Sequence, residues 1–351
     1  MVASPPGPIL GIETSCDETS AAILDGGEIR GHVILSQDVH RVYSGVVPEL
    51  AARAHLRVLD DVVDATLHEA GMELGEVGAF GVTAGPGLIG ALLVGATWAK
   101  AAAWGLGRPL VGVHHMEAHL FAASIEDPDA VPPFVALLVS GGHTMLLWVP
   151  EWGRYQLLGE TRDDAAGEAF DKVARILDMA YPGGPEIERA ATTVDGDPHP
   201  FTRPMLNRAQ RPGDPDYFAF SFSGLKTAVL TRVRELDAEG RLEQERPAVA
   251  RSFQRAVIDV LVAKTMRAVE EKDCPRVLIG GGVAASRALR DALTEALGNG
   301  GRLFHPSPRM ATDNGAMIAR TAAFRLDRGD RSGWDLRARA DLPFPGLERP
   351  C

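Results

Sequence analysis

Apolar residues in this chain are arranged in two ways, as short continuous runs and as longer stretches with helical spacing. Residues 9–24 and 134–149 each contain an apolar run, a polar turn and a second apolar run, which is the pattern of a β-hairpin. The two hairpins share one plan although they stand far apart in the sequence. This repetition predicts two lobes of related construction.

Helical periodicity separates the two hairpins. Residues 47–71 alternate apolar and polar faces and end at Gly71, a residue favoured just after a helix C-terminus. Residues 76–105 read as a strand, a glycine turn and a buried helix, and a short strand follows at 108–115. Further predicted segments are a helix at 166–185 stopped by Pro182, a surface loop at 194–218, a helix at 244–273, a strand and helix at 275–297, a helix at 310–326 and a loop or disordered tail after Gly329. Alternating strands and helices predict an α/β fold.

Composition narrows the class of protein. With 351 residues, 45% of them hydrophobic and 24% charged, the chain has the material for two globular domains. Its net charge of −11 argues against nucleic-acid binding driven by bulk charge. Three cysteines without a CxxC spacing favour a reducing compartment. The N-terminus does not read as a signal peptide, and the apolar run 89–104 is interrupted by Lys100, so we expect a cytoplasmic protein that does not enter a membrane.

The segment HHMEAHL, which begins at His114, carries the first candidate chemistry. His115 and His119 are four residues apart, so on a helix they lie on one face and both reach one cation. Imidazole suits zinc, iron and related metals. The segment resembles the HExxH motif of zinc peptidases, but Met116 stands where that motif has its glutamate base. The alternative is a pair of helix histidines without a metal.

Three polar or glycine-containing turns each follow an apolar strand, at residues 14–20, 140–144 and 280–286. Backbone N–H groups in such turns can surround phosphate oxygens, although each could equally be a tight turn. The order of hairpin, helices, second hairpin, glycine turn and closing helix resembles the actin, hexokinase and chaperone ATPase superfamily. That resemblance implies a two-lobed actin-like ATPase fold with a duplicated mixed-sheet core and a central cleft.

A narrower resemblance covers residues 9 to about 325. The segments that carry it are ETSCDET, VVPELAARAH, TAGPGLIGALLVG, HHMEAHL, LVSGGHT, GEAFDKVAR, YPGGP, FSFSGLKTAV, GGGVAASRALR and PSPRMATDNGAMIA. They resemble the bacterial TsaD family of tRNA N6-adenosine threonylcarbamoyltransferases, once described as glycoproteases. We accordingly expect an N-terminal lobe at 8–131 completed by 313–328, a C-terminal lobe at 132–312 and a tail at 329–351.

The resemblance implies an acyltransferase. Members of the family move the threonylcarbamoyl group from threonylcarbamoyl-AMP to the exocyclic 6-amino group of adenosine 37, in tRNAs that read codons beginning with A, and AMP leaves. It also implies one divalent metal ion, Fe²⁺ or Zn²⁺, with His115, His119 and Asp313 as ligands, and leaves ATP or ADP binding open. The positions that fall on the family's substrate-binding residues are Leu138, Val139, Ser140, Gly141, Gly142, Asp171, Gly184, Glu188 and Ser286.

Several of these residues have simpler alternatives. Asp313 precedes a helix, so it could serve as an N-cap instead of a ligand. Ser286 stands where the family commonly has asparagine, which puts a contact to the adenosine part of the substrate in doubt. An adenosine amine must lose a proton when it attacks, and Asp17 and Glu18 in the first turn are the candidates for that task; either could instead accept backbone hydrogen bonds. Cys16 is expected to fill the turn, because no activating base stands beside it.

The expected partners are tRNA, a paralogous non-catalytic subunit similar to TsaB and a small ATPase similar to TsaE. The helix from Val47 to Ala70 is the candidate dimer surface. Arg203, Arg208 and Arg211 suit phosphate contacts, although isolated surface arginines are common. The alternative functions are an ATP-dependent small-molecule kinase or a carbamoyltransferase of the same superfamily; a metallopeptidase is disfavoured by Met116.

Overall fold

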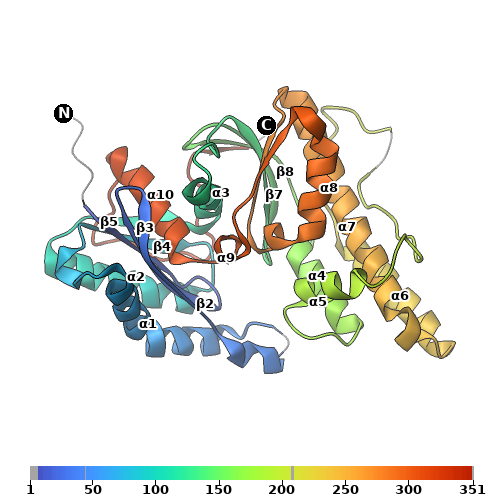
Figure 1. Ribbon diagram of the computed structural model, residues 1–351, viewed down its shortest axis with the longest axis horizontal. Coiled ribbons are helices and arrows are strands. Elements are labelled where there is room, and N and C mark those ends of the chain that lie inside the picture. Colours follow the sequence, from blue (N-terminus) through green and yellow to red (C-terminus); the bar gives the residue numbers. More distant parts are fainter. Residues whose placement is uncertain (1–6, 44, 207–208, 350–351) are drawn as a thin grey trace. The chain divides into compact units, whose positions relative to one another are not determined.

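The computed structural model describes residues 7–43, 45–206 and 209–349 (Figure 1). They form two compact units, each discontinuous in sequence. The first, here the N-terminal unit, comprises the chain up to Pro128 together with Thr312–Pro345. The second, the C-terminal unit, comprises Asp129–Ala311 together with the residues from Gly346 onward.

The N-terminal unit is built on a five-stranded mixed sheet in the order β3-β2-β1-β4-β5. Strands β1–β3 form an antiparallel meander, and β4 and β5 continue the sheet parallel to β1. Every residue of β1 and β4 is buried, as the continuous apolar runs predict. The strands are β1 (Ile9–Glu13), β2 (Glu18–Asp25), β3 (Glu28–Ser36), β4 (Ala79–Gly85) and β5 (Leu110–His114).

The C-terminal unit repeats this plan. Its sheet has the order β10-β9-β6-β7-β8-β11, with an antiparallel β6–β7–β8 meander and with β9 and β10 continuing parallel to β6. The strands are β6 (Phe134–Val139), β7 (Thr144–Glu151), β8 (Arg154–Glu160), β9 (Arg276–Gly280), β10 (Arg302–Phe304) and β11 (Leu347–Glu348). The shared strand order confirms the duplicated mixed-sheet core that the two hairpins predict.

Helices cover both faces of the N-terminal sheet (Figure 1). Side chains alternate along β1: Leu10 and Ile12 join a core cluster with residues of α1 and α2, whereas Gly11 faces α10. A Cβ at Gly11 would meet the backbone of Gly315 and Ala319, so only glycine permits this close approach. The helices and 3₁₀ turns are η1 (Asp38–Tyr43), α1 (Pro48–Ala70), η2 (Leu74–Glu76), α2 (Ile89–Leu106), α3 (His115–Glu126) and α10 (Gly315–Asp327).

Helix α1 ends as its sequence predicts, with Gly71 at φ 66° in the left-handed region. Helix α2 departs from expectation in one respect. By length and composition it reaches the minimum for a helix that crosses a membrane, so the interruption by Lys100 does not exclude a span on that criterion. Within the unit this helix packs against α1 and β4, and its buried small residues include Ala91, Gly95 and Ala99.

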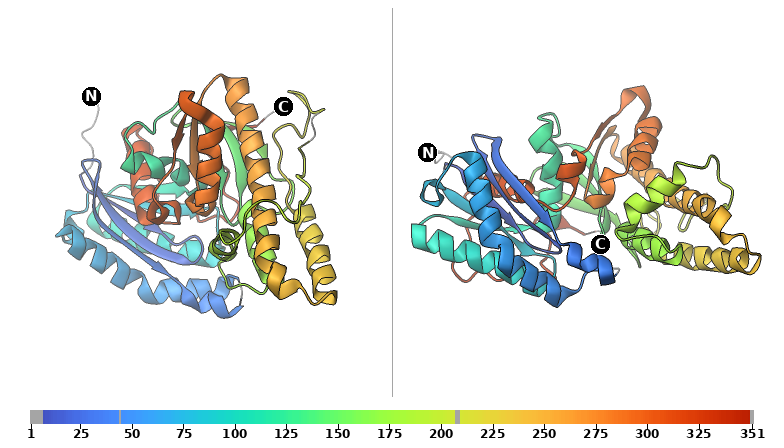
Figure 2. Two further views of the ribbon diagram at one scale, coloured as in Figure 1. Left: turned by 45° about the vertical axis from the view of Figure 1, so that its right-hand side comes forward. Right: turned by 60° about the horizontal axis from the view of Figure 1, so that its bottom comes forward.

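In the C-terminal unit one large core joins the sheet to its helices. Helices α6 and α7 run side by side (Figure 2). The predicted helix at 166–185 is in fact two helices, because α5 starts again at Gly183 directly after Pro182. The helices and 3₁₀ turns are α4 (Ala166–Ile176), α5 (Gly183–Ala191), α6 (Ser223–Ala238), α7 (Leu242–Lys272), η3 (Gly282–Ala285), α8 (Arg287–Leu297), η4 (Gly298–Gly300) and α9 (Pro308–Ala311).

Residues 329–345, here the C-terminal strap, contain no helix or strand but are bound to the N-terminal unit. Ser332 N–H donates to the carbonyl of Leu110 (2.8 Å), and Arg339 N–H donates to that of Ala84 (2.8 Å). The strap thus follows the edge of β4 and β5 and is an ordered loop. Beyond it, β11 pairs with β8 in the C-terminal unit.

Candidate active site

The two histidines lie at the junction of β5 and α3. Strand β5 ends at His114 and α3 begins at His115. His114 is the N-cap, and its Nδ1 accepts from Glu117 N–H. One turn of helix separates His115 from His119, and their ring centroids lie 4.7 Å apart. The i, i+4 spacing therefore does bring both imidazoles to one face, as predicted.

Asp313 completes the cluster from the start of α10. The N-cap of α10 is Asn314, whose side chain accepts from Met317 N–H at 3.0 Å, so the capping alternative for Asp313 is wrong. Asp313 Oδ1 lies 3.4 Å from His115 Nε2 and 3.2 Å from His119 Nε2. One ligand atom from each of the three residues fits within 4.8 Å.

The surroundings of His119 fit a metal ion at this point. Its side chain is fully buried, and neither ring nitrogen has a hydrogen-bond partner of acceptable geometry among the described residues. A buried polar atom without such a partner is costly in a folded protein. A cation between the two imidazoles and the carboxylate would satisfy Nε2. Two histidines and one carboxylate are also a ligand set that leaves coordination positions open.

Charge and burial tune the three groups differently. Burial alone raises the pKa of Asp313, but the charge of His115 and the close contacts of both histidine rings with the carboxylate outweigh it and hold that pKa far below its usual range. Burial lowers the pKa of His119, and the neighbouring His115 adds to the effect despite the opposing carboxylates. His119 is therefore a neutral imidazole at neutral pH, with a lone pair available. At His115 the carboxylates of Asp313 and Glu13 overcome burial and raise the pKa.

Glu13 is a component of this site that the sequence predictions missed. It ends β1 with no exposed surface, and its Oε2 lies 3.0 Å from His115 Nδ1. The signal was present in the sequence, because Glu13 is the single charged residue within an otherwise apolar, fully buried strand.

The first turn places Asp17 and Glu18 in the electrostatic field of the same cluster. Burial, followed by the charges of Asp313 and Asp17, raises the pKa of Glu18 well above its ordinary value. Burial and the neighbouring carboxylates also raise the pKa of Cys16 far above that of an ordinary thiol. Cys16 is thus a poor nucleophile, in agreement with the interpretation that it fills the turn.

The predicted substrate-binding residues all lie in the C-terminal unit. Leu138 and Val139 end β6, and the turn that follows is tight, with Ser140 N–H donating to the carbonyl of His143 at 2.9 Å. A Cβ at Gly281 would meet the carbonyl of Val139, so the glycine turn after β9 lies against this turn. Gly141 and Gly142 have open space where a Cβ would be. The structure therefore brings two of the three predicted turns together.

Asp171, Gly184, Glu188 and Ser286 lie around helix α5. Asp171 Oδ1 accepts from Gly183 N–H at 2.8 Å, at the start of that helix. Glu188 Oε1 accepts from Ser286 Oγ at 3.2 Å and from Ala288 N–H at 2.9 Å. Ser286 is the N-cap of α8. Glu188 and Ser286 are therefore directly bonded to each other, whereas Gly184 has open space beside it.

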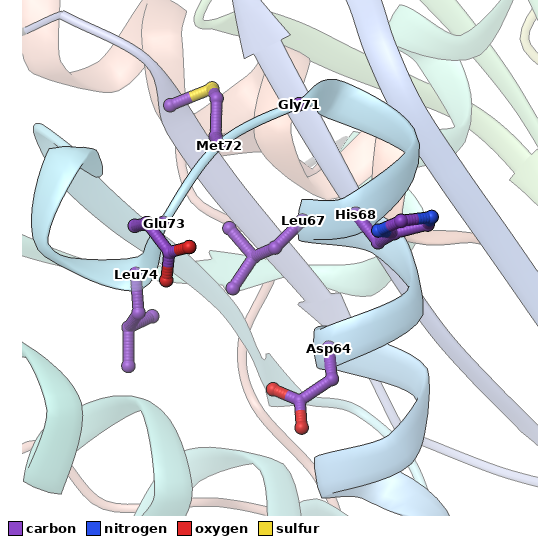
Figure 3. Close-up of a pocket in the computed structure, with 7 residues that line it drawn as sticks. All are labelled: Asp64, Leu67, His68, Gly71, Met72, Glu73 and Leu74. Atoms are coloured by element: carbon purple, nitrogen blue, oxygen red, sulfur yellow. The ribbon is translucent and has the colours of Figure 1, made fainter.

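A separate surface pocket lies at the C-terminal end of α1 (Figure 3). Asp64, His68 and Glu73 supply its polar lining, and Leu67, Gly71, Met72 and Leu74 complete it. None of the predicted site residues belongs to it.

Comparison with solved structures identifies the class of fold. Component A of (R)-2-hydroxyglutaryl-CoA dehydratase from Acidaminococcus fermentans aligns with a TM-score of 0.54 and 16% identity, over 92% of this chain and 99% of that one. HypF from T. kodakarensis aligns with a TM-score of 0.58 and 14% identity, over 92% of this chain and 47% of that one. With the duplicated mixed sheet, these similarities define the protein as a member of the actin-like ATPase fold class.

Sequence comparison then gives the family. The family model TsaD, tRNA N6-adenosine threonylcarbamoyltransferase, matches residues 28–320. Proteins of that name from Gemmatimonas aurantiaca and Desulfitobacterium hafniense are 54% and 49% identical to this chain. The alignments cover 97% of this chain in both cases, and 98% and 96% of the relatives. The chain belongs to the TsaD family and is an acyltransferase of tRNA, which confirms the main prediction over the kinase and carbamoyltransferase alternatives.

Proposed function

We propose that this protein transfers the threonylcarbamoyl group of threonylcarbamoyl-AMP to the 6-amino group of adenosine 37, in tRNAs that read codons beginning with A, with one divalent metal ion held by His115, His119 and Asp313. The observation that carries the metal site is the convergence of their three ligand atoms within 4.8 Å, in a chain of the TsaD family.

In this reaction the adenosine nitrogen forms a bond to the carbamoyl carbon, the bond from that carbon to the phosphate oxygen breaks, and AMP leaves. The amine nitrogen is a weak nucleophile because its lone pair is delocalised into the ring, so the acyl donor must be activated and correctly placed. The ion, when bound, supplies positive charge that polarises an oxygen of the donor. His119 contributes a neutral nitrogen to hold it, and Asp313 contributes a permanent negative charge.

The attacking amine also loses a proton, and Glu18 is the proposed acceptor. Its raised pKa makes the carboxylate a stronger base than an ordinary glutamate. Asp17 raises that pKa through its charge and its hydrogen bond to Glu18, so we assign Asp17 the task of tuning Glu18. An Asp17→Asn protein should therefore shift the rising limb of its pH–rate profile to lower pH.

The C-terminal unit is proposed to hold the adenylate portion of the donor. The turn of Leu138 to Gly142 and the start of α5 at Gly184 provide backbone N–H groups and open space, features suited to phosphate and ribose. Glu188 on α5 reaches Ser286 at the start of α8, and the two would act as a pair because they are bonded to each other. The same arrangement could accept ATP or ADP.

Two histidines and one carboxylate accept Fe²⁺ and Zn²⁺ alike. We therefore propose a single divalent ion of either kind.

For partners, we propose a paralogous subunit similar to TsaB on the face formed by α1 and α2. The exposed large apolar side chains of these helices include Leu56 (72%), Ile89 (49%) and Leu93 (50%), and the two helices pack against each other. Exposed apolar side chains on paired helices suit a helical partner. Leu56→Asp should abolish co-purification of that subunit, whereas Val131→Asp, at an exposed apolar residue of the other unit, should leave it intact. The small ATPase similar to TsaE and a cytoplasmic location rest on the family resemblance.

The loop at 194–218, which contains Arg203, Arg208 and Arg211, is a weaker candidate for binding tRNA than its sequence indicates. Arg203 forms ion pairs with Asp197 and Asp259 at 2.9 and 2.7 Å, so its charge is already compensated. Arg208 lies outside the described residues, and Arg211 remains a proposed phosphate contact.

The experiment that tests the function is nucleoside mass spectrometry of total tRNA from cells depleted of this protein and rescued by variants. Wild type should restore threonylcarbamoyladenosine, and the double variant His115→Ala/His119→Ala should not. His68→Ala, at an exposed histidine of α1, is the matched control and should restore it fully. A modification level that does not respond to depletion would show that the protein acts elsewhere.

A further inference from the structure

Glu13 is a carboxylate in a place where carboxylates are rarely tolerated. It is fully buried at the end of β1, at the centre of the N-terminal sheet. Burying a carboxylate is costly unless hydrogen bonds replace its lost water. The contacts of Glu13 should therefore indicate its role.

Three groups surround the two oxygens of Glu13. Oε1 accepts a short hydrogen bond from the backbone N–H of Ser15. Oε2 accepts from Thr83 Oγ1 at 2.7 Å and lies 3.0 Å from His115 Nδ1. An ionised carboxylate can only accept hydrogen bonds. The proton in the contact between Glu13 and His115 therefore belongs to the imidazole.

The position of that proton determines which ring nitrogen of His115 can bind a metal ion. With the proton on Nδ1, a neutral His115 carries its lone pair on Nε2, the nitrogen 3.4 Å from Asp313 Oδ1. Ser15 Oγ also lies 3.3 Å from Nδ1, but a hydroxyl can donate as well as accept and so does not fix the tautomer. Glu13 alone among these neighbours has the chemistry to fix it.

We infer that Glu13 is a positioning residue for the metal site: its carboxylate holds His115 in the tautomer and orientation that direct Nε2 at the ion. This rests on the proposed function, since it presupposes that His115 is a ligand. Carboxylates that hold the outer nitrogen of a metal-binding histidine are a general device, and their loss weakens metal binding by about 10–100-fold. Thr83 and Ser15 in turn hold the carboxylate, so the device extends across β1, β4 and α3.

The test compares Glu13→Gln with Glu117→Gln in the full chain, with Zn²⁺ alone as the probe. Glu117 is the matched control because it is also a buried glutamate, 1% exposed, but pairs with Arg325. Zn²⁺ affinity is measured by calorimetry, and the protonation of the His115 nitrogens in the Zn²⁺-loaded protein by ¹⁵N NMR. We expect Glu13→Gln to bind Zn²⁺ about 10–100-fold more weakly and to lose the Nδ1 proton signature of His115. Glu117→Gln should lower the melting temperature but keep both.

Unchanged affinity and an unchanged Nδ1 proton in Glu13→Gln would overturn the inference, and so would equal losses in both variants, which would mark a role in folding only. If the wild-type protein binds Zn²⁺ but not through His115 and His119, the proposed metal site fails and this inference fails with it. Should Glu13→Gln not fold, Glu13→Asp replaces it: the carboxylate is kept but is one methylene too short for Nδ1, and affinity should fall in the same direction.

Discussion

At the scale of single residues, the surroundings shift the pKa values of the ionisable side chains in the candidate site in different directions. His119 is neutral, whereas Asp313 is ionised far below the pH at which an ordinary aspartate would be. Glu18 is driven in the opposite direction, toward its protonated form. The surroundings thus shift the pKa values of these carboxyl groups in opposite directions, which suits the proposed roles of Asp313 as a fixed anion and of Glu18 as a proton acceptor.

The raised pKa of Glu18 has a consequence for stability. A carboxyl group whose folded-state pKa lies above its unfolded value favours folding below the unfolded pKa, about 4.3, and that contribution is lost as pH rises through the folded-state pKa. In the metal-free protein, Glu18→Gln should therefore raise the melting temperature at pH 8 and have little effect at pH 4. Thermal denaturation across this range checks it, with Glu28→Gln, at an exposed site, as the control. Parallel curves for wild type and Glu18→Gln would contradict it.

Ser286 offers a second prediction at this scale. Its hydroxyl caps α8 by accepting from Leu289 N–H and donates to Glu188. Ser286→Ala should lower the free energy of unfolding by about 1 kcal/mol through the lost cap, as measured by chemical denaturation. Ser286→Asn, which introduces another good N-cap residue and the one that the family commonly has, should retain most of the stability. An alanine variant as stable as wild type would show that Glu188 caps the helix sufficiently alone.

At the scale of elements, the chain's periodicity predicts most of the architecture. The two hairpins, the helix that ends at Gly71 and the long helix after residue 244 are where the apolar pattern places them. The break between α4 and α5 escaped prediction because Pro182 and two glycines read as the end of a helix, whereas here a proline cap and Gly183 begin one. The convergence of His115, His119 and Asp313 was predictable from motifs. Glu13 was not recognised, because a charge within a strand does not indicate its partner, and its contact with His115 exists only where β1 and α3 meet in the tertiary structure.

The packing of β1 against α10 gives a prediction for these elements. Gly11 allows the backbone of α10 to approach the sheet closely, and Asp313 immediately precedes the N-cap of α10. Gly11→Ala should destabilise the protein by at least about 1–3 kcal/mol, the usual cost of overpacking, and weaken metal binding by displacing Asp313. Gly26→Ala is a contrasting variant, because Gly26 has open space beside it but φ 58°; it should lose stability through backbone strain yet bind metal normally. Equal metal binding by both variants would count against the link between Gly11 and the site.

At the scale of the whole molecule, the C-terminal strap links distant parts of the chain to the histidine helix. His114 Nε2 donates to the carbonyl of Leu342 at 3.0 Å, and its ring lies 4.7 Å from that of Phe344. Lys100 Nζ donates to the carbonyl of Leu336 at 3.1 Å. The strap therefore holds the N-cap of α3, and through it the helix that carries both histidines.

Removal of the strap tests this link. A chain that stops after Asp330 should show faster amide hydrogen exchange at the start of α3, because His114 loses its partner Leu342. A chain that stops after Pro345 loses only β11 and should exchange like wild type there. Equal exchange at α3 in the two truncated chains would contradict the link.

The division of the N-terminal unit between the two ends of the chain also sets an order in protein synthesis. Domains usually form in the sequence in which they leave the ribosome. Here the C-terminal unit has almost all of its residues available before α10 emerges. Almost all of the C-terminal unit is therefore synthesised after the two histidines but before Asp313 and before α10, the helix that covers the other face of the N-terminal sheet. A nascent chain halted before residue 312 holds two of the three candidate ligands and none of α10, so this enzyme's candidate metal centre can be completed only after the C-terminal unit has been almost entirely synthesised.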